Sequence, residues 1–172
     1  MKITHFFVLL FLFSASLLIM LKPQQYQKAD SEKIPQMEIE DFTLYEINTE
    51  GVKSVVSGTV GRQYDLYYEV ENAHYVENKN RMGEHLYADK GKFEKDIAYL
   101  DENVRYFRDD GLSFESDHAV YDTKKELLYV PKSFVLTQNK NVIYGNELHY
   151  NAKSGEIDAK QINASYYMKD KK

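Results

Sequence analysis

Histidines and paired carboxylates are the side chains in this sequence best suited to acid–base or metal chemistry. The histidines show no HxH or HExxH spacing, and the absence of cysteine excludes thiolate ligands, disulfides and Cys/His metal sites. The pairs Asp101-Glu102 and Asp109-Asp110 lie at expected turns, and Gly111 after the second pair is typical of a turn. With no GxSxG, P-loop or GxGxxG motif either, the sequence indicates no enzyme, no metal site and no cofactor. The histidines are His5, His74, His85, His118 and His149.

The charge balance excludes a further class of partner. The chain has 172 residues and a net charge of −5, and Lys2 and Lys22 are the only charged residues before position 23. The remainder is therefore more acidic than the whole chain. Neutralising phosphates requires an excess of Lys and Arg, so nucleic acid is not an expected partner.

An apolar segment at the N-terminus predicts a membrane anchor. Residues 3–21 form an uncharged and almost wholly apolar run, and a helix of this length spans roughly 28 Å, about the hydrocarbon thickness of a bilayer. A cleaved signal peptide is the alternative, because Ser14-Ala15-Ser16 offers small residues, but the apolar run continues beyond them. We therefore predict a transmembrane anchor at 1–22.

The rest of the chain divides into a linker and one domain. Residues 23–36 are mostly polar and predict a linker, and residues 37–172 are enough for one domain. Lysines near the anchor do not decide its orientation, but a short N-terminus before a long domain favours a cytoplasmic N-terminus and a periplasmic domain.

The domain has the pattern of an all-β protein. Its short runs rich in Tyr, Phe, Val, Ile and Leu fit a pleated, half-buried surface, and turn signals separate them. Several runs alternate, so Val142, Tyr144, Leu148 and Tyr150 are expected on one apolar face. The turn signals are Asn48–Gly51, Asn78–Asn80, Asp109–Gly111, Asn139–Asn141 and Ala152–Gly155.

A repeat sharpens the predicted architecture. Segments 85–107, 112–137 and 141–167 each contain an apolar run, a small residue followed by Asp or Asn, and an aromatic residue four positions further on. Repeats of this length indicate stacked strand pairs with open edges rather than one closed barrel. The small residue and its acidic or amide neighbour are Ala88-Asp89, Ser116-Asp117 and Gly145-Asn146.

The sequence resembles the LptC family, the bitopic periplasmic component of the lipopolysaccharide export ABC transporter. The features that carry this resemblance are the anchor, the linker, a first strand ending in Leu44–Gly51, and the repeat. The resemblance implies an open, twisted β-jelly roll with no chemistry of its own. It implies that the protein receives lipopolysaccharide from inner-membrane transporter subunits and passes it to a soluble periplasmic bridge protein, with the acyl chains in the apolar interior. Gly51 matches a functionally important family glycine, whereas Pro131 stands where a second one is expected.

The sequence is compatible with two functions from different classes. The first is lipopolysaccharide transport, and the alternative is a membrane-tethered β-scaffold that assembles an envelope complex through its sheet edges without binding lipid. An anchored hydrolase or lectin-like domain fits less well, since no catalytic constellation is present. We expect Gly51 and Gly145 to serve partner binding or structure. The predicted lipid-binding residues are Phe93, Tyr106, Phe114, Tyr121, Phe134, Tyr144 and Tyr150.

Overall fold

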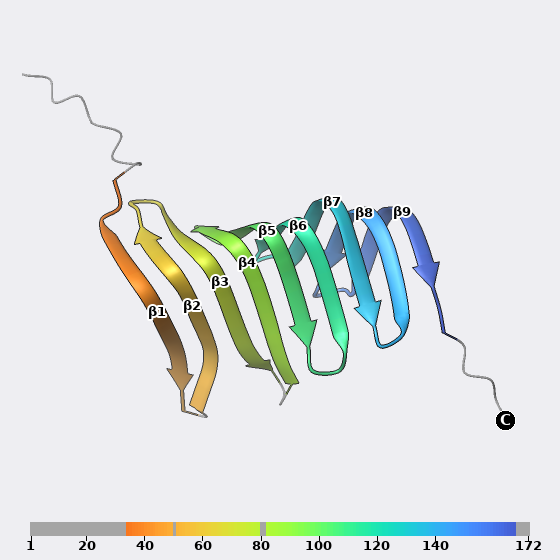
Figure 1. The fold of residues 1–172 in the computed structure, drawn as a ribbon, viewed down its shortest axis with the longest axis horizontal. Helices are drawn as coiled ribbons and strands as arrows, with labels where there is room; N and C mark the ends of the chain where they lie inside the picture. Colours follow the sequence, from red (N-terminus) through yellow and green to blue (C-terminus); the bar gives the residue numbers. More distant parts are fainter. Residues whose placement is uncertain (1–33, 50, 80–81, 168–172) are drawn as a thin grey trace, which may run out of the picture. The chain divides into compact units, whose positions relative to one another are not determined.

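The computed structural model describes residues 34–49, 51–79 and 82–167. These residues form a nine-stranded antiparallel sheet in which every strand pairs with its neighbours in sequence, so the order is β1 to β9 (Figure 1). The predicted all-β class with an open sheet is confirmed. The strands are β1 (Met37–Asn48), β2 (Gly51–Gln63), β3 (Tyr67–Lys79), β4 (Met82–Glu94), β5 (Ile97–Arg108), β6 (Leu112–Asp122), β7 (Leu127–Gln138), β8 (Asn141–Asn151) and β9 (Glu156–Ser165).

The predicted anchor and most of the predicted linker lie outside the described residues. Within residues 34–49, 51–79 and 82–167, no helix is long and apolar enough to cross a membrane.

The three repeat copies correspond to three hairpins. Segment 85–107 covers most of β4 and β5, segment 112–137 covers β6 and β7, and segment 141–167 covers β8 and β9. The small residue and its Asp or Asn lie in the middle of β4, β6 and β8, where the pairing register with the next strand shifts. The repeated motif therefore marks a structural irregularity inside each of these strands rather than a turn.

These irregularities form a mid-strand bend across the sheet. Several residues there adopt the left-handed conformation, with φ between 45° and 63°, which Asn and Asp tolerate better than other non-glycine residues. Polar side chains bridge the bend from strand to strand. Asn103 Nδ2 donates to Asp89 Oδ2 at 2.5 Å, and Asn146 Nδ2 donates to Gln161 Oε1 at 2.6 Å. The left-handed residues inside strands are Asp41, Asn72, Glu102, Asn103, Glu147 and Gln161.

The bend divides the sheet into two layers. Layer A contains the strand portions next to the β1–β2, β3–β4, β5–β6 and β7–β8 connections, and layer B contains those next to the other four. In Figure 1 layer A lies in front, and the fainter, more distant portions of β5 to β8 pass behind it. One hydrophobic cluster joins the layers, since it includes Phe114 of layer A and Val130 of layer B, which is 0% exposed. We call the face that contains this cluster the inner face and the opposite one the outer face.

Candidate functional site

A continuous row of mostly apolar side chains crosses the inner face of layer A. Each member is the direct cross-strand partner of the next, so all of them point to the same side of the sheet. The row begins on one edge strand and ends on the other. Its members, from β1 to β9, are Leu44, Val56, Tyr75, Leu86, Tyr106, Phe114, Leu136, Ile143 and Ala164.

A second row crosses layer B and faces the first. It also has one member per strand, and only Gln63 among them is strongly polar. The two rows give the folded sheet an apolar lining that extends from β1 to β9. The second row contains Met37, Gln63, Tyr68, Phe93, Ala98, Tyr121, Leu128, Tyr150 and Ile157.

Six of the seven aromatic residues expected to contact lipid lie on the inner face. Tyr106 and Phe114 pair with each other in the layer A row, and the Phe134 ring lies 6.1 Å from the Phe114 ring. The other three on this face belong to the layer B row: Phe93, Tyr121 and Tyr150.

Tyr144 is the exception, because it lies on the outer face. Its cross-strand partner is Val135, and its side chain is 53% exposed. The prediction that Val142, Tyr144, Leu148 and Tyr150 share one face is therefore wrong. Glu147 adopts φ 49° where the β8 register shifts, so the side-chain alternation changes sides halfway along the strand.

Exposure separates residues of the folding core from residues that a ligand can reach. Phe114 and Phe134 are only 7% and 4% exposed, so they belong to the core. Phe93 on the same face is 40% exposed. Toward the edge strands the lining opens further, with Leu44 of β1 56% exposed and Ile157 of β9 61% exposed.

The accessible lining residues Leu44, Tyr68 and Ile157 are absent from the set predicted from sequence. Each lies near a strand end or on an edge strand, among polar neighbours that conceal the apolar pattern. The cross-strand register reveals them, and a single sequence does not specify that register.

Hydroxyls of partly buried tyrosines provide the polar points of this lining. Burial and the Glu77 carboxylate raise the pKa of Tyr75 to about 12, and the hydroxyl donates to Glu77 Oε2 at 3.1 Å. Burial, followed by Glu84, raises the pKa of Tyr106 well above its usual value. Burial also raises the pKa of Tyr121 in layer B, with smaller contributions from carboxylates that include Glu77 of layer A.

These tyrosines predict a loss of stability at alkaline pH. The folded-state pKa of Tyr75 is above the value of about 10 in an unfolded chain, so its contribution is complete below pH 10 and decreases as the pH rises toward 12. In a spectrophotometric titration of tyrosinate, we expect a late component that becomes smaller in the double variant Tyr75→Phe, Tyr106→Phe. A titration curve with the same late component in that variant would contradict this assignment.

Glycines allow two close contacts at this lining. A Cβ on Gly145 would lie 2.6 Å from Phe134 Cζ and 2.7 Å from Ile162 Cδ1, so the absent side chain makes room for both. Gly51 is different, because a Cβ there would meet nothing within 4 Å, but its φ of 123° disfavours any other residue. The structure thus gives Gly145 a packing role and Gly51 a turn role.

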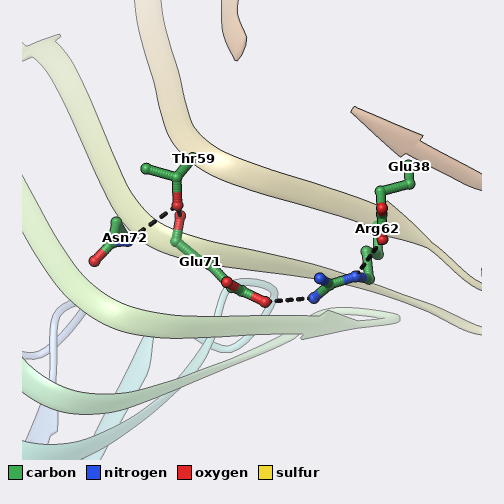
Figure 2. A network of polar contacts seen from close by, with 5 residues as sticks. All are labelled: Glu38, Thr59, Arg62, Glu71 and Asn72. Atoms are coloured by element: carbon green, nitrogen blue, oxygen red, sulfur yellow. Dashed lines mark hydrogen bonds and ion pairs between the residues drawn. The ribbon is translucent and has the colours of Figure 1, made fainter. Parts of the chain in front are cut away.

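The edge strand β1 is fastened to the sheet through a polar network on the outer face (Figure 2). Arg62 Nε donates to Glu38 Oε2 at 2.6 Å and Nη1 donates to Glu71 Oε1 at 2.5 Å, which joins three strands. These hydrogen bonds raise the pKa of Arg62. Asn72 Nδ2 donates to Thr59 Oγ1 at 3.0 Å beside them. The network fixes β1 while its outer backbone edge stays unpaired within the described residues.

The described histidines have structural partners. His118 Nδ1 contacts the Asp101 carboxylate, His149 stacks on Tyr129, and His74 lies 3.4 Å from His85 between ring nitrogens. Among residues 34–49, 51–79 and 82–167, no group of three or more His, Cys, Asp or Glu side chains is arranged to bind a metal ion.

A family model described as "Lipopolysaccharide-assembly, LptC-related" matches residues 7–167. No curated protein matches the chain.

Proposed function

The chain belongs to the LptC-related family of lipopolysaccharide assembly, a non-enzymatic transport component, and we propose that it moves lipopolysaccharide along the inner face of its folded sheet. The observation that supports this proposal is the layer A row, which reaches from edge strand β1 to edge strand β9 without interruption. Acyl chains need apolar contact along their length and few polar anchors. The row provides both, together with the hydroxyls of Tyr75 and Tyr106.

The exposure of the lining suggests where the lipid enters. The lining is most exposed at the two edge strands, where Leu44 and Ile157 lie, and most tightly packed in the centre around Phe114. We infer that acyl chains first contact the edge residues and replace side-chain contacts of the protein itself as they advance. Of the aromatic residues named from sequence, Phe93 is then the best candidate for direct lipid contact.

In the part of the chain that the structure describes, β1 and β9 each leave one backbone edge unpaired, and these edges suggest how the carrier is placed between its neighbours. An unpaired edge strand is a template for β-augmentation by another sheet. In the twisted, open β-jelly roll expected of the family, the β1 edge would meet inner-membrane ABC transporter subunits and the β9 edge a periplasmic bridge protein. The anchor at 1–22 would hold the domain at the periplasmic side of the inner membrane.

Photo-crosslinking in living cells tests this function. The crosslinking amino acid would replace Leu44, Phe93 or Ile157 on the inner face, and Tyr45 or Tyr129 on the outer face as matched controls. We expect capture of lipopolysaccharide from the inner-face positions and at least about tenfold less from the controls, because the sheet separates the two faces. Equal capture from both faces would overturn the proposal.

The free edges also suit the alternative, a tethered scaffold that binds no lipid. That function predicts capture of partner proteins from β1 and β9 positions, with no lipopolysaccharide at Leu44, Phe93 or Ile157.

A further inference from the structure

The outer face has a furrow that the proposed lipid path does not use. It has a volume of about 490 Å³ and crosses β5 to β9 next to the mid-strand bend. Arg105, Glu115, Val135 and Tyr144, which line it, are successive cross-strand partners on the outer face. The inner row and the furrow therefore lie on opposite sides of one sheet.

The furrow is rich in planar polar side chains that remain available for hydrogen bonding. Within the described residues, the side chains of Glu115, Asp117 and Tyr144 make no hydrogen bond or ion pair. Arg105 and Glu115 are direct cross-strand partners and yet form no ion pair there, since the guanidinium of Arg105 lies over the Tyr87 ring, 5.8 Å from its centroid. Side-chain amides of Asn146 and Gln161 complete the polar lining.

The chemistry of this lining defines the ligand. Planar carboxylate, amide and guanidinium groups can each engage two neighbouring hydroxyls, and a half-exposed aromatic ring offers an apolar platform with a polar tip. The lining holds one positive charge, from Arg105, and two negative charges, from Glu115 and Asp117, which favours a neutral ligand over an anion. The volume is within the range of about 300–1,000 Å³ typical of small-molecule sites.

We propose that this furrow is a saccharide-binding site that takes one or two neutral pyranose rings, with Tyr144 as the stacking platform and Arg105, Glu115 and Asp117 as hydrogen-bonding groups. The site is independent of acyl-chain binding, because the sheet lies between the furrow and the inner face. It also gives Tyr144 a role that its position on the outer face otherwise leaves unexplained.

The test is a titration of the isotope-labelled, full-length chain with two disaccharides, maltose and N,N′-diacetylchitobiose, followed by amide chemical shifts. The detergent must have a zwitterionic rather than a sugar headgroup, so that it does not compete. We expect saturable shifts that cluster around Arg105, Glu115 and Tyr144. Tyr144→Ala should weaken binding by about fivefold or more, since it removes the stacking surface.

Tyr129→Ala is the matched control, because Tyr129 is also on the outer face, is 38% exposed and does not line the furrow. Its affinity for the disaccharides should equal that of the wild type. Absence of saturable shifts with both disaccharides, or equal losses in the two variants, would overturn the proposal. Neither result bears on lipid capture at Leu44, so failure here is distinct from failure of the proposed function.

Discussion

Gly145→Ala is expected to lower the free energy of unfolding by about 1–3 kcal/mol, the usual cost of overpacking a filled core. The new Cβ would lie 2.6 Å from Phe134 Cζ, and Phe134 is only 4% exposed, so a shift of its ring would disturb the packing of the core. Ile162 is 51% exposed and can move, which transfers part of the strain to edge strand β9. Urea denaturation of the full-length chain measures the change.

Gly91→Ala is the matched control, since Gly91 also lies inside a strand of the same sheet. A Cβ there would have its nearest contact at 3.6 Å, with Ala73 Cβ, which is ordinary van der Waals distance. We expect stability to stay unchanged or to rise by up to about 1 kcal/mol, because alanine loses less backbone entropy than glycine on folding. Equal denaturation midpoints for the two variants would refute the packing role of Gly145.

The large features of the fold could be predicted from the sequence because local chemistry determines them. All five turn signals, among them Asp109–Gly111, coincide with connections between strands, and each repeat copy forms a hairpin. Glycine, asparagine and aspartate favour turns wherever they occur, and apolar runs between them favour strands. These preferences act over a few residues and need no knowledge of the partner strand.

The mid-strand bend could not be predicted in this way. Alternation places Tyr144 with Leu148 only if the strand is regular, and the left-handed conformation of Glu147 breaks that regularity. Lys95 and Glu126 likewise adopt φ of 56° and 57° in two connections that lack a glycine. Such conformations are unfavourable for these residues in isolation, so tertiary packing must impose them.

The division between core and accessible lining depends on the same long-range information. Phe114 and Phe93 are both aromatic strand residues of the repeat segments and both lie on the inner face, yet they are 7% and 40% exposed. The difference arises because Phe114 lies near the middle of the sheet, where layer B covers it. Phe114→Glu would therefore report mainly on folding, and a functional test requires residues that are apolar, exposed and on the inner face.

Leu44→Asp is expected to abolish lipopolysaccharide capture by the carrier while the domain stays folded. Leu44 is 56% exposed, so a charge there stays hydrated and costs the free protein little. An acyl chain that moves along the inner face would have to dehydrate that charge, which is unfavourable by several kcal/mol. We therefore expect lipopolysaccharide capture by a crosslinking amino acid at Phe93 to fall at least about tenfold in this variant. A free-energy cost of about 1.4 kcal/mol already corresponds to a tenfold loss of binding.

Tyr45→Asp is the decisive control, because the two residues are adjacent on the same edge strand and have similar exposure, 61% for Tyr45. Tyr45 pairs with Val55 on the outer face, whereas Leu44 pairs with Val56 on the inner face. Both variants add one negative charge to the β1 edge, so docking of the transporter through that edge should change equally in both. If lipid passage falls only in Leu44→Asp while partner co-purification is the same, the inner face conducts lipid. If the two variants behave alike, the protein acts through its edge alone, and the scaffold function replaces the carrier.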